Sequence, residues 1–151
     1  MNTNTATVET LNDLIGINND RISGYEKALK DIKGKDADLQ ELFTHMIDES
    51  RTMRNALGKE VQGLGGEMET GKTTGGKLYH AWMELKSVFT GHDRHAILSD
   101  CETEEDAAMR AYTQALQEDY LPAYLREMLT RQRSTLKTEH DRIKKMRDAQ
   151  A

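Results

Sequence analysis

Residues 97–115 read ILSDCETEEDAAMRAYTQA, a stretch in which apolar side chains recur at helical spacing. An α-helix advances about 100° per residue, so residues three and four apart share a face. The apolar stripe of this predicted helix consists of Ile97, Cys101, Ala108, Tyr112 and Ala115. Glu105 falls inside the stripe. A carboxylate at a core position is costly unless it has a partner, so Glu105 requires an explanation.

Three further stretches show the same pattern of an apolar stripe interrupted by polar side chains. The stripes are Leu11, Ile15, Ile22, Tyr25 and Leu29; then Leu39, Met46, Met53, Leu57 and Leu64; and finally Leu125, Leu129, Leu136 and Ile143. The polar side chains in or beside them are Asn18 and Glu26; then Glu49 and Ser50; and finally Gln132, Glu139 and His140. The sequence therefore predicts four helices that each direct a polar group toward one interior.

The connections between these helices predict their order in space. The predicted helices span 8–32, 37–64, 93–118 and a stretch beginning at Pro122, and a short helix spans 77–89. Short connections join the first pair and the last pair, which favours antiparallel neighbours. The link of roughly 28 residues between 64 and 93 is long enough to return along the bundle. This connectivity predicts an all-α, up-down-down-up four-helix bundle with one long crossover, as in ferritin-like folds.

Composition narrows the class of protein. The 151 residues suit a single domain, 1–151, and a hydrophobic share of 36% with a charged share of 31% is typical of a helix-rich chain. A net charge of -5 argues against non-specific nucleic-acid binding. No apolar run approaches the roughly 20 residues that span a bilayer, so we expect no membrane insertion. Cys101 is the only cysteine and Met1 is not followed by a signal-peptide pattern, so we expect a cytoplasmic protein.

Residues Gly66, Gly71, Lys72 and Thr73 match the phosphate-loop pattern G-x-x-x-x-G-K-[ST]. That motif requires a buried strand before the loop and a helix that starts at the lysine. Here a helical pattern precedes the loop, and two more glycines follow it. We therefore expect no nucleotide binding and interpret the glycine-rich stretch 63–76 as part of the crossover.

The interior carboxylates suggest a site for iron or manganese. Centres of this kind in bundles combine glutamates with Glu-x-x-His motifs, because hard cations prefer oxygen ligands and an imidazole completes the coordination. The candidate ligands are Glu26, Glu49, Glu105 and either Gln132 or His140. Counted from the turn near Leu121, Glu105 and Leu136 lie at about the same height in the bundle. Gln132 and His140 are therefore each about one helical turn above or below Glu105.

The ligand pattern is incomplete, and an alternative remains open. Thr52 stands where a histidine should follow Glu49, and Glu139 and His140 are adjacent, so their side chains diverge by about 100°. In the alternative, the polar groups hydrogen-bond one another or buried water and hold the helices in register. Buried carboxylates would then have raised pKa values or pair with arginine.

The chain resembles a family of bacterial ferritin-like four-helix-bundle proteins that is catalogued as a domain of unknown function. The matching stretches are Leu11 to Ile15 with Asn18, Asn19, Asp20, Gly24 and Tyr25; His80, Ala81, Trp82, Leu85 and Lys86; Cys101, Glu102, Glu105, Asp106 and Tyr112; and His140, Asp141, Ile143, Lys144, Arg147 and Asp148. The resemblance implies a rubrerythrin- or ferritin-like bundle with a stress association, and it brings no established reaction.

These observations lead to two hypotheses of different classes. In the first, a ferritin-like bundle holds iron or manganese and supports metal-assisted oxidation or peroxide handling. In the second, the same bundle is a non-catalytic interaction or structural protein that forms a homo-oligomer or docks a partner. Its contact surface would be the amphipathic helix at 78–89, which carries Trp82.

Overall fold

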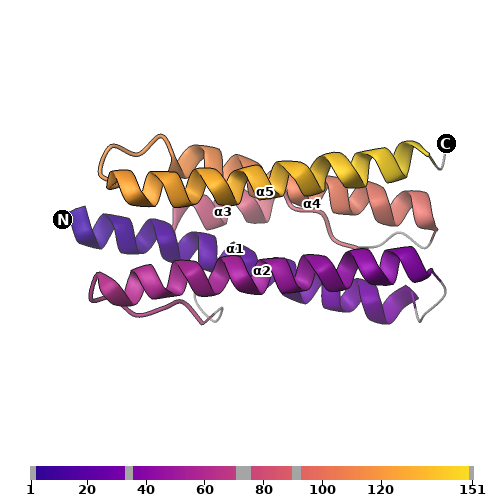
Figure 1. Cartoon of the computed structure of the whole chain (residues 1–151), viewed down its shortest axis with the longest axis horizontal. Helices are drawn as coiled ribbons and strands as arrows, with labels where there is room; N and C mark the ends of the chain where they lie inside the picture. Colours follow the sequence, from indigo (N-terminus) through magenta and orange to yellow (C-terminus); the bar gives the residue numbers. More distant parts are fainter. Residues whose placement is uncertain (1–2, 33–35, 71–75, 90–92, 150–151) are drawn as a thin grey trace.

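A computed structural model describes residues 3–32, 36–70, 76–89 and 93–149 of the chain. Within these ranges the regular structure is entirely α-helical, as the sequence predicts. The helices are α1 (Thr3–Ile32), α2 (Ala37–Gly63), α3 (Lys77–Leu85), α4 (Arg94–Ala115) and α5 (Ala123–Asp148). Figure 1 shows the four long helices side by side, with α1 and α5 running in one direction and α2 and α4 in the other.

The predicted helix boundaries are close to the observed ones, with three informative differences. α1 begins at Thr3 rather than residue 8. Aspartate before a helix predicts a capping side chain, and Asp36 is at the N-cap of α2, but its side chain makes no capping hydrogen bond and its carboxylate lies 3.5 Å from Arg94. α3 ends at Leu85 rather than residue 89. Gly91, which follows the predicted helix 77–89 and is a helix-stop signal in the sequence, lies outside the described residues.

The buried apolar side chains form two clusters along the length of the bundle. One cluster contains Leu14, Leu57, Trp82 and Leu125, among others, and the second contains an aromatic group of Tyr25, Phe43 and Phe89. Ring centroids in the aromatic group are 5.7 to 6.5 Å apart, a normal packing separation. Every long helix contributes side chains to both clusters. The position at which each helix passes from one cluster to the other defines the middle of the bundle.

Polar side chains occupy this middle position on all four long helices. We call this set the polar layer, and it comprises Asn18 and Arg21 from α1, Glu49 and Ser50 from α2, Glu104 and Glu105 from α4, and Glu139 from α5, together with Gln132, which lies about two turns earlier on α5. All are buried except Glu49, which is half-buried. Most of the polar interruptions seen in the sequence therefore collect near one level of the fold, whereas Glu26 is about half exposed and lies outside the layer.

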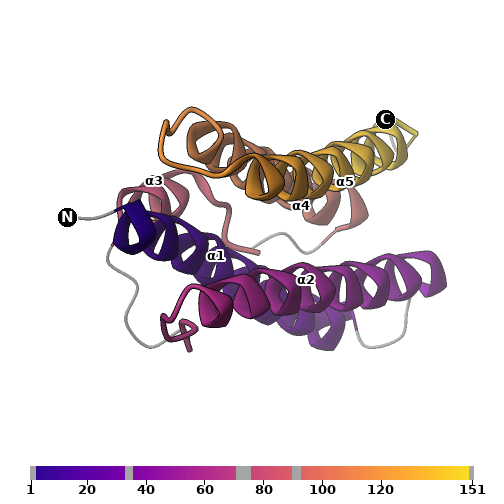
Figure 2. The ribbon, with the colours of Figure 1, turned by 60° about the vertical axis from the view of Figure 1, so that its left-hand side comes forward.

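The short helix α3 packs against α1 and α4 near the N-terminal end of α1 (Figure 2). The Asp13 carboxylate of α1 accepts hydrogen bonds from the backbone amides of Leu78 and Tyr79, at 3.1 and 3.4 Å. It thereby caps the start of α3 from a neighbouring helix, a role usually taken by the N-cap side chain. The N-cap residue of α3 is Gly76, and a methyl group there would overlap the Asp13 carboxylate.

Trp82 is not on a contact surface, which corrects one sequence expectation. Its side chain is 0% exposed, and its indole Nε1 donates a hydrogen bond of 3.0 Å to Asp20 of α1. The exposed apolar residues near α3 are instead Met83, Leu85 and Val88. An amphipathic pattern shows which side chains share a face, but it does not show which face meets the rest of the protein.

The glycine-rich crossover follows a helix, as the sequence predicts. Gly66 comes three residues after the end of α2, and no strand occurs in the described part of the chain. Gly71, Lys72 and Thr73 lie outside the described residues. None of the described helices combines the length and apolarity that a bilayer crossing requires.

Candidate metal centre

An arginine is fully buried at the centre of the polar layer. Arg21 of α1 donates to both carboxylate oxygens of Glu105 on α4, from Nε to Oε2 at 3.0 Å and from Nη2 to Oε1 at 2.7 Å. Both side chains are 0% exposed. Burial alone lowers the pKa of the Arg21 guanidinium, but the charge of Glu105 raises it, so the net pKa is above its usual value. This bidentate pair is the strong geometry for an arginine and a carboxylate.

The pair has two further partners. The Tyr25 hydroxyl donates to Glu105 Oε2 at 2.9 Å, and Arg21 Nη1 donates to Asn18 Oδ1 at 2.9 Å. Burial and the adjacent Glu105 charge raise the pKa of Tyr25 well above its ordinary value, so the hydroxyl keeps its proton. Glu105, a predicted metal ligand, is therefore already held by three donors on α1.

A hydrogen-bond chain crosses the bundle beside this pair. Asn18 Nδ2 donates to the Tyr112 hydroxyl at 3.1 Å, and that hydroxyl donates to Gln132 Oε1 at 2.6 Å. Gln132 Nε2 then donates to the backbone oxygen of Met53 at 3.3 Å. These three hydrogen bonds link α1, α4, α5 and α2 in turn. These contacts match the register-fixing network that the sequence left open as an alternative.

A second group of polar side chains lies between α2 and α5. His45 Nε2 is 3.3 Å from Glu49 Oε2 and 3.3 Å from Glu139 Oε2. His45, Glu49 and Glu139 each offer one ligand atom, and these three atoms lie within 4.8 Å of one another. This spacing could hold a metal ion. His45 and Glu49 are four residues apart on α2, so the helix itself places them together. In the described part of the chain, this is the only such group of three.

Two carboxylate oxygens in this group have no hydrogen-bond partner. Glu49 Oε1 and Glu139 Oε2 are both buried and make no hydrogen bond, although His45 and Arg142 lie within ion-pair distance of Glu139. The Glu139 side chain is only 7% exposed. Buried acceptors without hydrogen bonds are rare because they cost folding free energy. These two oxygens are therefore suited to binding a cation.

The electrostatics of Glu49 show the same excess of negative charge. Burial, followed by the charges of Glu139 and Glu105, raises the pKa of Glu49 to about 7, although the charges of Arg21 and Arg142 act in the opposite direction. A carboxyl group with such a pKa is destabilised in its ionised form by its present surroundings. A divalent cation between Glu49 and Glu139 would remove that repulsion.

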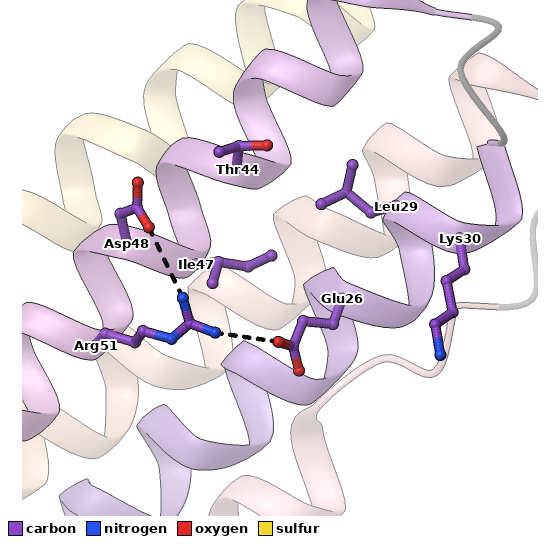
Figure 3. A pocket seen from close by; sticks show the side chains of 7 residues that line it. All are labelled: Glu26, Leu29, Lys30, Thr44, Ile47, Asp48 and Arg51. Carbon is purple, nitrogen blue, oxygen red and sulfur yellow. Dashed lines mark hydrogen bonds and ion pairs between the residues drawn. The ribbon is translucent and has the colours of Figure 1, made fainter.

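The other predicted ligands lie elsewhere. Glu26 is about half exposed and pairs with Arg51 at 3.2 Å, on the rim of a groove of about 510 Å³ between α1 and α2 (Figure 3). His140 points to α4, where its Nε2 is 3.7 Å from Glu102. Gln132 is engaged in the hydrogen-bond chain. Of the five predicted residues, only Glu49 belongs to the group of three.

The sequence predicts Glu139 as an interior polar side chain but not among the candidate ligands, and it gives no role to Arg21 or His45. His45 and Glu49 are four residues apart, a spacing that is visible in the sequence, but His45 falls outside the apolar stripe, which predicts an exposed side chain. Its side chain is indeed 47% exposed, yet its ring reaches the edge of the polar layer. Arg21 lies three residues after Asn18 on the same face, which was also readable.

The chain matches the family model described as a domain of unknown function, DUF2383, over residues 6–118. It belongs to the DUF2383 family. No curated protein matches the chain. In this DUF2383 protein the matched range contains His45, Glu49, Arg21 and Glu105, whereas Glu139 on α5 lies beyond its end.

Proposed function

We propose that this DUF2383 protein binds one divalent transition-metal ion, iron or manganese, through His45, Glu49 and Glu139. The observation that carries the proposal is that Glu49 and Glu139 each have one buried oxygen without a hydrogen bond, and that both carboxylates lie 3.3 Å from the same imidazole nitrogen of His45. Two carboxylates and one imidazole suit the borderline-hard ions Fe²⁺ and Mn²⁺. Glu49 is retained from the sequence prediction, and His45 and Glu139 replace the four residues whose side chains lie elsewhere.

We further propose that the bundle is ferritin-like. Support comes from the helix directions in Figure 1 and from the long crossover, which contains α3 and separates the two hairpins. A metal ion held by three protein ligands keeps coordination positions for water or a small oxidant, and it would supply Lewis-acid or redox chemistry there. His45 faces solvent on one side, which gives such a ligand access. We therefore associate the protein with metal handling or oxidative stress.

Metal analysis of the purified protein tests the proposal. We expect about one equivalent of iron or manganese in protein prepared without chelators, and loss of that ion in H45A, E49Q and E139Q. E26Q is the matched control, because Glu26 was also a candidate ligand but pairs with Arg51 outside the group. A folded wild type that takes up neither ion from solution would contradict the proposal.

The second candidate function is a metal-free structural or interaction bundle. The specific observation in its favour is that Arg21, Glu105, Tyr112 and Gln132 already satisfy one another inside the core. In this case the polar layer only holds the helices in register. The exposed apolar residues Met83 and Val88 would then be the first surface to test for self-association. A chelator-treated protein with an unchanged melting temperature and a dimeric mass that M83S/V88S abolishes would favour this function.

A further inference from the structure

The Arg21 guanidinium is enclosed by oxygen atoms. Its Nε and Nη2 donate to Glu105 Oε2 and Oε1, and its Nη1 donates to Asn18 Oδ1. The side chain is fully buried, so these interactions are not weakened by water. An all-oxygen enclosure with a charged carboxylate is also what a hard metal cation prefers.

A further carboxylate lies beside this enclosure. Glu104 of α4 is fully buried, and its Oε2 makes no hydrogen bond. Burial and the charge of Glu105 raise the pKa of Glu104 well above its ordinary value, while the charge of Arg21 acts in the opposite direction. The backbone leaves room for Glu104 at Gly24 of α1, where a Cβ atom would lie only 3.1 Å from Glu104 Oε1. The absence of a side chain at Gly24 therefore leaves space for the Glu104 carboxylate, and one of its oxygens has no hydrogen-bond partner.

The charges of the polar layer are unbalanced. Its carboxylates are Glu49, Glu104, Glu105 and Glu139, and Arg21 is the only cation that belongs to the layer itself in the described structure. Arginine cannot lose its proton in a protein, and it cannot dissociate as a metal ion can. Arg21 therefore supplies a permanent positive charge beside Glu105, whereas neither Glu49 nor Glu139 lies within ion-pair distance of it.

We propose that Arg21 is a tethered cation that fills a second cation position, formed by Glu105 and Asn18 with Glu104 as the next residue on α4, and so limits the protein to one metal ion. This inference deepens the proposed function and rests on it, because it assigns the number of ions that the polar layer accepts. Arg21 is then a specificity-determining residue, since it selects one metal ion over two.

Metal stoichiometry of Arg21 variants tests the inference. Titration with Mn²⁺, followed by calorimetry and metal analysis after desalting, should give one more ion per chain in R21A than in the wild type. R21K keeps a positive charge and should bind the same number of ions as the wild type. R21A/E105Q removes both the arginine and the main oxygen ligand, and it should lose the additional ion. A folded R21A with no additional ion overturns the proposal.

The fold of R21A is itself a readout. Without metal, R21A leaves Glu105 buried and uncompensated, so its helical circular dichroism signal should be reduced, and Mn²⁺ should restore it. R21A that stays unfolded in saturating Mn²⁺ overturns the proposal, because the oxygen enclosure then does not accept a free cation. R21A/H45A separates the two sites: it should bind one ion where H45A binds none. A wild type without metal would contradict the site at His45, whereas the additional ion in R21A/H45A would still support the role of Arg21.

Discussion

Glu139 of α5 lies 3.3 Å from His45 of α2, and this contact joins helices from the two different hairpins of the bundle. Figure 2 shows the α1 and α2 pair on one side and the α4 and α5 pair on the other. A ligand held between His45 and Glu139 would therefore connect the two halves directly, and its effect should extend to global stability.

We predict that Mn²⁺ or Fe²⁺ stabilises the folded protein. An ion that binds only the folded state contributes about 2.7 kcal/mol at a free concentration 100 times its dissociation constant. For a chain of this size the melting temperature should rise by about 5 to 10 °C. Calorimetry with and without chelator measures the shift. H45A should show none, and an equal shift in H45A would mean that the stabilising ion binds elsewhere.

The stability of the metal-free protein should fall as the pH rises from about 4.5 to about 7. The pKa of Glu49 is raised from 4.5 to about 7 in the folded state, so between these values the folded state binds more protons than the unfolded chain. We expect a loss of about 1 to 2 kcal/mol across this window, after allowing for partial solvent screening. Urea denaturation in chelator at several pH values measures it.

The matched control for this pH dependence is E49Q. Glu104 and Asp13 also have raised pKa values, so the contribution of Glu49 is the difference between the wild-type and E49Q curves. The curve of unfolding free energy against pH should be flatter for E49Q than for the wild type between about pH 4.5 and pH 7. Parallel curves for the two proteins would show that the Glu49 carboxyl titrates alike in the folded and unfolded states.

Replacement of Glu105 by glutamine should strongly destabilise the protein. E105Q leaves the Arg21 guanidinium buried without its charge partner, at an expected cost of about 3 to 5 kcal/mol. E26Q breaks the exposed pair with Arg51 and should cost less than about 1 kcal/mol. Urea denaturation in chelator compares them. Similar midpoints for the two variants would argue against a buried, charged Arg21 and Glu105 pair.

G76A should displace α3 from α1. The added methyl group overlaps the Asp13 carboxylate, which caps α3 by accepting from the backbone amides of Leu78 and Tyr79. We expect a cost of about 1 to 3 kcal/mol. Trp82 is the only tryptophan and is fully buried in the α3 contact, so its fluorescence emission should shift to longer wavelength.

G63A is the control for this substitution. Gly63 is the last residue of α2, and a methyl group there meets no atom within 4 Å. Its stability and Trp82 emission should match those of the wild type. An unshifted emission spectrum in G76A would mean that Asp13 can adopt another position without releasing α3.

Much of the fold could be predicted because its signals are local. The periodicity of residues 97–115 shows a helix and a stripe, and the lengths of the connections predict which helices run in the same direction. The polar interruptions at Asn18, Glu49 and Glu105 were also visible, and they do lie at one level of the bundle. Helical spacing correctly predicted that Glu139 and His140 diverge, because adjacent residues differ by about 100° around a helix.

The partners of these side chains could not be predicted in the same way. Glu105 has the same place in its stripe whether it binds a metal or an arginine, and only the position of α1 brings Arg21 against it. A rotation of α5 by a fraction of a turn would have brought His140 rather than Glu139 toward α2. Trp82 likewise became buried because α3 packs on α1 through Asp20.

The sequence by itself determined the helices, their apolar faces and the fact that each long helix carries a polar group into the core, because these properties depend on residues within a few turns of one another. Tertiary structure alone decided which polar groups meet. It joins Glu105 to Arg21 and leaves oxygens of Glu49 and Glu139 without hydrogen-bond partners beside His45, because interactions over 3 Å depend on the rotation and height of each helix against its neighbours.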